Sequence, residues 1–133
     1  MKKIFLLTCL FISFCFISCD PAESLEAIII NNSSQDLKIT FVSVEIPDFN
    51  ETFEIESNSK ILHSEIVGIG DANLGFHNYD SIYIENYSNE ILKVYKANTP
   101  GKNIYNVDEY WQKRKPSKNH FVYTYEITEE DFE

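Results

Sequence analysis

Near its C-terminal end the chain contains the run HFVYTYEI, which spans residues 120–127. Successive side chains of a β-strand point to opposite faces, so one face of this run carries Phe121, Tyr123, Tyr125 and Ile127. Alternation with β-branched and aromatic residues is typical of a half-buried strand. We therefore expect the last strand of the chain to be a member of the core.

Six further runs of similar composition precede this strand. They are rich in Ile, Val, Phe, Tyr and Thr, and clusters of Asn, Ser, Gly, Asp and Pro separate them. They cover residues 26–31, 36–46, 52–56, 60–67, 81–87 and 91–97. Seven short strands within roughly 100 residues, with turn signals between them, favour a two-sheet sandwich over a closed barrel. We predict a single two-sheet antiparallel β-sandwich, immunoglobulin-like or transthyretin-like, with one short helix.

The helix is expected between the sixth and seventh strands. Asn106 is a favourable N-cap, and Glu109 would complete a capping box three residues later. The basic run at residues 113–115 suits the negative end of a helix dipole, and Pro116 would end the helix. The apolar side of this helix is expected to lie on the sheet edge or over one open end of the core.

The N-terminus has the organisation of an export signal. Lys2 and Lys3 precede an apolar stretch at residues 4–17, and the small residue Ser18 follows it. Spanning a bilayer takes about 20 apolar residues, so this stretch is short for a permanent transmembrane helix. We predict cleavage between Ser18 and Cys19.

The four residues Phe16-Ile17-Ser18-Cys19 resemble the bacterial lipobox, with Phe16 in place of the usual leucine. The resemblance implies a diacylglycerol on the sulfur of Cys19 and usually a further acyl chain, such as palmitate, on its freed amine. Two or three chains hold a protein on a membrane far more firmly than one chain does. The alternative is an ordinary signal peptide in which the thiol is incidental.

These features divide the chain into a signal peptide at residues 1–18, a tether at residues 19–25 and a sandwich domain at residues 26–133. The whole chain has a net charge of −10, and removal of the signal with its two lysines would change this to −12. Such a charge disfavours nucleic acid and bare anionic lipid surfaces as partners. It permits a basic partner, although it also serves solubility.

The cysteines predict a domain without thiols. Cys9 and Cys15 lie in the predicted signal, and Cys19 would be acylated. An exported domain can normally use disulfides, whereas this one would depend on apolar burial and sheet pairing. A cysteine nucleophile and a cysteine metal site are excluded on the same reading.

No motif indicates catalysis or a bound metal. His63, His77 and His120 are scattered and lack the spacing of a zinc site. Residues 71–75 begin like a calcium loop, but Ile82 stands where the loop needs its bidentate glutamate. Neither a nucleophile elbow nor a phosphate-binding or dinucleotide motif occurs. We predict a protein that is not an enzyme and that has no cofactor.

Two features remain as candidate sites. Tyr110 and Trp111 belong to an aromatic-rich second half, and flat rings of this kind grip sugars, although core packing or stapling of the helix is the stronger interpretation. Asp80-Ser81-Ile82 resembles the O-glycosylation acceptor of Bacteroidetes, with Ser81 as the modified residue. The simpler interpretation of Ser81 is the start of a strand.

The C-terminal residues 123–132, the stretch at residues 80–84 and the stretch from Asn103 to Trp111 resemble those of small uncharacterised Bacteroidetes lipoproteins. The resemblance implies a β-sandwich held at the outer membrane, on its periplasmic or outer side, and brings no assigned activity. We expect a non-catalytic binding or accessory module with a protein or glycan partner. The alternative is an acidic immunity or inhibitor lipoprotein that binds a basic toxin or enzyme.

Overall fold

The structure is a computed structural model that describes residues 22–69 and 73–133. The described chain forms an all-β sandwich of two four-stranded sheets, which confirms the predicted fold class. The strands are β1 (Ala22–Asn31), β2 (Leu37–Val42), β3 (Glu51–Ile55), β4 (Ser59–Ile69), β5 (Ser81–Asn86), β6 (Ile91–Tyr95), β7 (Gln112–Ser117) and β8 (His120–Ile127). Short helical turns connect them: η1 (Pro47–Phe49), η2 (Phe76–Asn78), α2 (Val107–Tyr110) and η3 (Glu129–Phe132).

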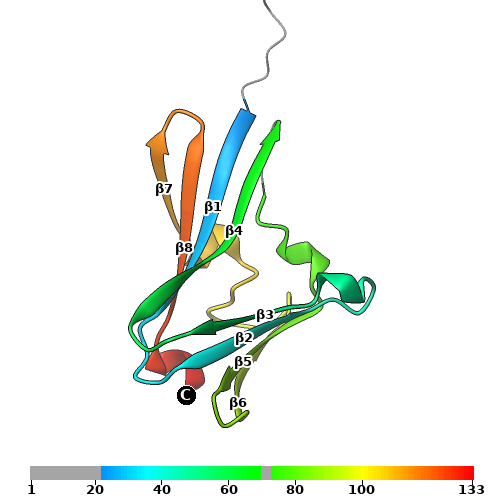
Figure 1. The fold of residues 1–133 in the computed structure, drawn as a ribbon, viewed down its shortest axis with the longest axis vertical. Coiled ribbons are helices and arrows are strands. Elements are labelled where there is room, and N and C mark those ends of the chain that lie inside the picture. Colours follow the sequence, from blue (N-terminus) through cyan, green and yellow to red (C-terminus); the bar gives the residue numbers. More distant parts are fainter. Residues whose placement is uncertain (1–21, 70–72) are drawn as a thin grey trace, which may run out of the picture.

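Sheet A has the strand order β4-β1-β8-β7, and sheet B has the order β3-β2-β5-β6. Figure 1 shows that the strands of the two sheets run in clearly different directions. All pairings are antiparallel except that of β1 with β8, which is parallel. The prediction of a purely antiparallel sandwich is therefore wrong in this one pair, which joins the first and last strands in the middle of sheet A.

The core lies between the facing sides of the two sheets. In β2 the side chains of Leu37, Ile39 and Phe41 are fully buried, and the residues between them are half-buried. On the predicted face of β8 only the last two members, Tyr125 and Ile127, are fully buried; Phe121 and Tyr123 are half-buried, and Val122 and Thr124 of the other face are buried instead. Burial of one such side chain stabilises the fold by about 1.5–3 kcal/mol.

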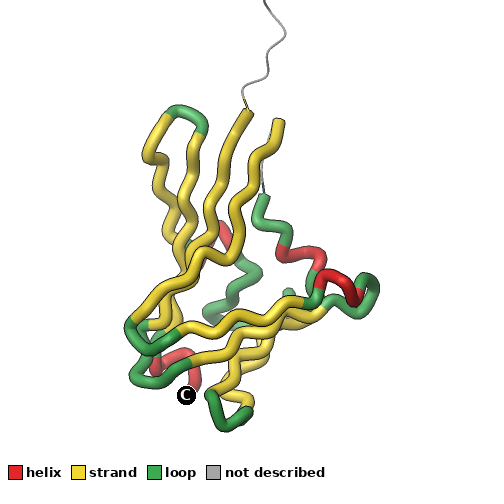
Figure 2. The backbone as a smooth tube through the Cα atoms, viewed as in Figure 1, coloured by secondary structure: helices red, strands yellow, loops and turns green. Residues whose placement is uncertain are grey.

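One end of sheet A extends beyond sheet B, and Figure 2 shows strands there without a second layer. We call residues 22–24, 67–69 and 113–121 the projecting end. Every residue of β7 is exposed, and Val67 on β4 is 70% exposed. The outer strand carries lysines and a proline, which discourage edge-to-edge pairing with another sheet.

Two predicted boundaries are wrong. Strand β1 begins at Ala22 rather than at residue 26, so residues 22–25 pair with β4 instead of forming a tether. The helix α2 ends at Tyr110 after a single turn, and the Asn106 side chain makes no capping hydrogen bond. The basic run at residues 113–115 lies in strand β7, because pairing with β8 satisfies its backbone groups in place of helical bonds.

Candidate functional site

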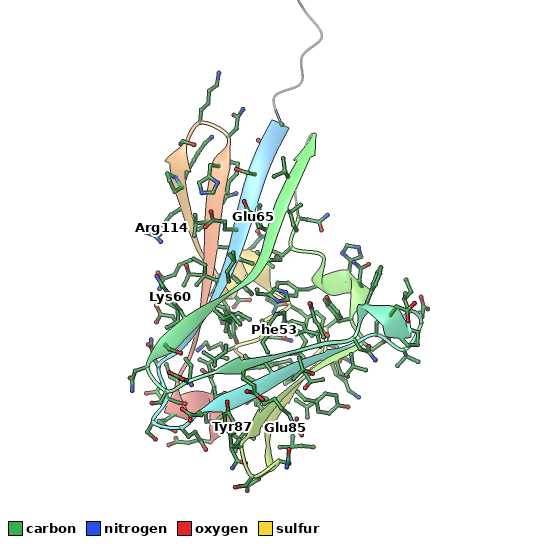
Figure 3. The ribbon with its side chains drawn as sticks, viewed as in Figure 1. Phe53, Lys60, Glu65, Glu85, Tyr87 and Arg114 are labelled. Atoms are coloured by element: carbon green, nitrogen blue, oxygen red, sulfur yellow. The ribbon has the colours of Figure 1, made fainter. Side chains whose placement is uncertain are left out.

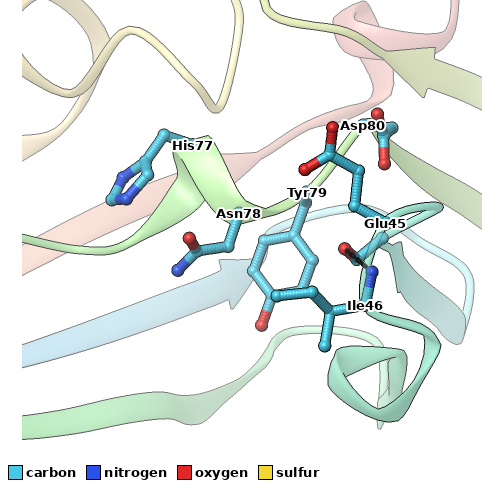
Figure 4. A pocket seen from close by; sticks show the side chains of 7 residues that line it. Glu45, Ile46, His77, Asn78, Tyr79 and Asp80 are labelled. Carbon is cyan, nitrogen blue, oxygen red and sulfur yellow. Dashed lines mark hydrogen bonds between the residues drawn. The ribbon is translucent and has the colours of Figure 1, made fainter.

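A cleft of about 320 Å³ lies at one end of sheet B. Its walls are the segment that follows β2, and η2 with the two residues that join it to β5. The lining residues are Ser43, Glu45, Ile46, His77, Asn78, Tyr79 and Asp80. Figure 4 shows these side chains from close by.

Hydrogen bonds between the two walls fix the shape of this cleft. The backbone N–H of Val44 donates to Oδ2 of Asp80 over 2.5 Å, and the N–H of Asp80 donates to the carbonyl of Val42 over 2.8 Å. The N–H of Ser43 donates to Oδ1 of Asn50 over 2.6 Å. Asp80 and Asn50 thus hold the loop after β2 in one conformation.

This loop is also where apolar side chains are exposed together. Val44 is 73% exposed, Ile46 is 45% exposed and Phe49 is 46% exposed. We call residues 44–49 the β2–β3 loop. An exposed apolar group beside a polar cleft is typical of a surface that binds another molecule.

The polar groups of the cleft are suited to binding. Figure 4 shows the carboxylates of Glu45 and Asp80 on one side of the cleft, whereas the ring of His77 points away from them. Carboxylates accept hydrogen bonds from hydroxyl, amide or cationic groups of a ligand.

A second cluster lies behind this cleft, inside the sandwich. Strand β4 carries one extra residue relative to β1 between Ser64 and Leu62, and this residue is His63. The bulge directs its ring into the core, where it stacks on Phe41 with ring centroids 4.4 Å apart and on Phe76 at 5.6 Å. Nδ1 of His63 has no hydrogen-bond partner in the described structure.

Glu51 is the charged group nearest to this histidine. Its Oε1 lies 3.9 Å from Nδ1 of His63 and accepts a 2.5 Å hydrogen bond from the hydroxyl of Tyr79. Burial lowers the pKa of His63, and Glu51 opposes the shift only in part. Burial and the bond to Glu51 raise the pKa of Tyr79. His63 is therefore held neutral, and Tyr79 links this cluster to the cleft.

The predicted aromatic site is not assembled. Trp111 is 6% exposed, and its Nε1 donates a 2.8 Å hydrogen bond to the carbonyl of Ile104. Its ring packs on Phe76 and Tyr125. Tyr110 stays half-buried at the end of α2. A shared binding surface of these two residues is ruled out, because Trp111 turns into the core where the helix ends.

Ser81 begins strand β5, as the simpler interpretation predicts. It is 6% exposed, which argues against modification of the folded domain at this position. The carboxylate of its neighbour Asp80 accepts the hydrogen bond from the backbone N–H of Val44 that joins the two walls of the cleft. The acid that suggested an acceptor motif thus has a structural role.

Several predicted sites lie outside the described residues. Ser18 and Cys19 belong to these, as does Asp71 of the calcium-like segment. Of that segment, Gly75 is described; it has a φ of 69°, and its N–H donates to the side chain of Asn73, as in a tight turn. Within residues 22–69 and 73–133, no group of three or more His, Cys, Asp or Glu side chains is placed to hold a metal ion.

The remaining histidines occupy separate places. His77 is exposed in η2, and His120 lies on β8, with its Nε2 3.4 Å from Oε1 of Glu26. Among the helices of the described chain, none has the length and apolar character needed to cross a bilayer. No protein-family model, curated protein or solved structure matches this chain.

The sequence interpretation missed the β2–β3 loop. The run at residues 36–46 is predicted as one strand, but its apolar alternation changes face after Phe41: Leu37, Ile39 and Phe41 lie on one face, and Val42, Val44 and Ile46 lie on the other. Pro47 and Asp48 were the available signal for a turn, since they begin η1. The exposure of the apolar residues depends on sheet B ending at Val42, which is a property of the assembled sandwich.

Proposed function

We propose that this protein is a lipid-anchored protein of the bacterial cell envelope, held at the outer membrane through Cys19. Its sandwich would act as a non-catalytic binding or accessory module whose partner is a protein or a glycan. The support for the anchor is the lipobox-like sequence and the export signal before it. The support for binding is the β2–β3 loop and its cleft.

The observation that carries the binding role is the exposure of three apolar side chains within six residues. Water contact with Val44, Ile46 and Phe49 is unfavourable, and a partner that covers them would gain about 25 cal/mol for each Å² of apolar surface removed. The carboxylates of Glu45 and Asp80 beside them supply polar contacts at the rim. Binding surfaces commonly combine an apolar centre with a polar rim.

A second candidate function is an acidic immunity or inhibitor protein that covers a basic toxin or enzyme. It is favoured by the net charge of −10 and by the two carboxylates in the cleft. Opposite charge would accelerate association and make the rate strongly dependent on salt. An uncharged glycan partner would show little salt dependence, so this measurement separates a glycan from a basic toxin or enzyme.

A photo-crosslinking residue at position 49 in intact cells tests the binding role. Adducts are expected from a crosslinking residue at position 49 and not from one at position 91. Position 91 is the control, because Ile91 is similarly exposed, at 54%, but lies on β6, away from the loop. The anchor is tested separately by incorporation of a palmitate analogue, which Cys19→Ala should abolish. Equal adducts from both positions, or an absence of acylation in the native protein, would contradict the respective part of the proposal.

A further inference from the structure

The β7–β8 hairpin concentrates positive charge in an acidic protein. It carries Lys113, Arg114, Lys115 and Lys118, which are four of the nine basic residues that follow the predicted signal. All four are exposed, and Figure 3 shows Arg114 at the side of this hairpin. None of them lies within 4.0 Å of a carboxylate oxygen among the described residues.

Aromatic rings support the lysines on one face of the hairpin. Nζ of Lys113 lies 4.6 Å from the ring centroid of Phe121 and 5.2 Å from that of Tyr123. Nζ of Lys115 lies 4.8 Å from the ring of Phe121. Cation–π contacts of this kind hold an ammonium group in place, and half-buried aromatic rings beside lysines suit the boundary between a membrane and water.

The hairpin lies beside the point at which the chain would leave for its anchor. The N–H of Ser24 donates to the carbonyl of Asn119 over 2.8 Å, and Oγ of Ser24 lies 2.8 Å from Nδ1 of His120. Ser24 follows Cys19 by five positions, and an extended chain of that length spans at most about 18 Å. A lipid on Cys19 would therefore keep the hairpin turn close to the membrane surface.

Acidic residues gather at the opposite end of the molecule. The turn η3 and the last residue carry Glu129, Glu130, Asp131 and Glu133. Figure 1 shows this C-terminal turn far from the β7–β8 hairpin, at the other end of the sandwich. The uneven charge gives the domain a preferred orientation on an anionic surface, with the hairpin toward it and η3 away from it.

We propose that the β7–β8 hairpin docks on anionic phospholipid headgroups of the membrane that holds the anchor, with Lys115 and Lys118 as the principal contacts. The proposal rests on the proposed lipid anchor. Lys113 is a weaker contact because the rings of both Phe121 and Tyr123 already hold its ammonium group, whereas Lys115 contacts the ring of Phe121 alone. Protection of an edge strand accounts for the charges within β7 but not for Lys118, which lies in the turn beyond it.

The test uses the native lipoprotein in two kinds of vesicle, one of phosphatidylcholine alone and one with about a third phosphatidylglycerol. A water-soluble amine reagent modifies exposed lysines, and mass spectrometry gives the rate at each position. Attraction by an anionic surface raises the equilibrium constant for docking by about fivefold for each lysine near the surface. We expect Lys115 and Lys118 to react about fivefold more slowly with phosphatidylglycerol present, whereas Lys60 and Lys96 should react equally in both vesicles.

Paired charge variants identify the residues responsible. Ser117→Cys, labelled with a polarity-sensitive dye, reports contact of the hairpin with the surface. Lys115→Gln with Lys118→Gln should remove the dye response to phosphatidylglycerol, and Lys60→Gln with Lys96→Gln should retain it. The control pair removes the same charge from exposed positions outside the projecting end.

The outcomes separate this proposal from the anchor. Protein that washes off both kinds of vesicle would refute the anchor itself. Protein that stays bound but shows equal lysine rates in both would overturn the docking proposal and leave the anchor intact. Slower reaction of Lys115 and Lys118 in intact cells, without any effect of vesicle composition, would assign the hairpin to a protein or glycan partner and would also overturn lipid docking.

Discussion

The two ends of sheet A are built from the same four strands but are held in different ways. Where sheet A faces sheet B, Ile29, Tyr125 and Ile127 are fully buried, and Asn31 connects two loops through its side chain. At the projecting end, every residue of β7 is exposed and Val67 is 70% exposed. Strand pairing, the side-chain contact between Ser24 and His120 and a few lysine–aromatic contacts hold this end.

The comparison shows that stability and surface chemistry are placed at different ends of one sheet. Interior packing tolerates few substitutions, because each buried group has several partners. Residues of β7 can change their charge with little effect on the fold, since their side chains contact few neighbours. The projecting end can therefore present basic residues while the packed end supplies the stability.

Replacement of Trp111 is the strongest test of the packed end. Trp111→Ala removes ring contacts with Phe76 and Tyr125 and the hydrogen bond to the carbonyl of Ile104. We expect a loss of about 3–5 kcal/mol in the free energy of unfolding, measured by urea denaturation. Tyr110→Ala, one residue earlier and half-buried, should cost about 1 kcal/mol. Equal losses would show that Trp111 is not part of the core.

Asn31 gives the next largest expected effect. Its Nδ2 donates to the carbonyls of Gln35, Ile55 and Glu56 at 2.9–3.2 Å, and the residue is fully buried. Asn31→Ala leaves these acceptors without their donor and should lower the free energy of unfolding by about 2–4 kcal/mol.

The neighbouring Asn32 is the matched control for Asn31. Its side chain is exposed and makes a single 3.5 Å contact with Glu126. Asn32→Ala should change the free energy of unfolding by less than about 0.5 kcal/mol. If both asparagine variants were equally stable, the loop connection through Asn31 would not contribute to the packed end.

Local sequence pattern predicts most of the strands because alternation and turn residues act over short distances. Strand β8 was predicted with its observed bounds, and Phe53 and Ile55 of β3 face inward as their alternation with glutamates indicates. Strand β7 could not be found this way. Its basic residues resemble a helix end, and only the presence of β8 beside them makes an edge strand.

The same limit applies to the candidate site. The exposure of Val44 and Ile46 depends on where sheet B ends, and the burial of His63 depends on a bulge in the pairing of β1 with β4. Neither is encoded in a short spacing of residues. The sequence shows that His63 lies within an apolar run. The direction of its ring follows from the register of β4 on β1, which the sequence does not show.

Sheet A carries one histidine at each end, His63 where it is packed and His120 where it projects. Burial of His63 lowers its pKa below the ordinary 6.5, so the unfolded chain binds the proton first as the pH falls. The stabilisation by neutral His63 is complete above pH 6.5 and is lost progressively below it, toward the lowered folded pKa.

Urea denaturation between neutral pH and about pH 5.5, where carboxylates remain largely ionised, should therefore show wild-type stability declining with pH. His63→Phe should reduce this slope, because the replacement keeps a ring between Phe41 and Phe76 but cannot titrate. His120→Gln, at the projecting end, should retain it. If His120→Gln removed the slope and His63→Phe did not, the exposed end rather than the packed end would control the response of the fold to acid.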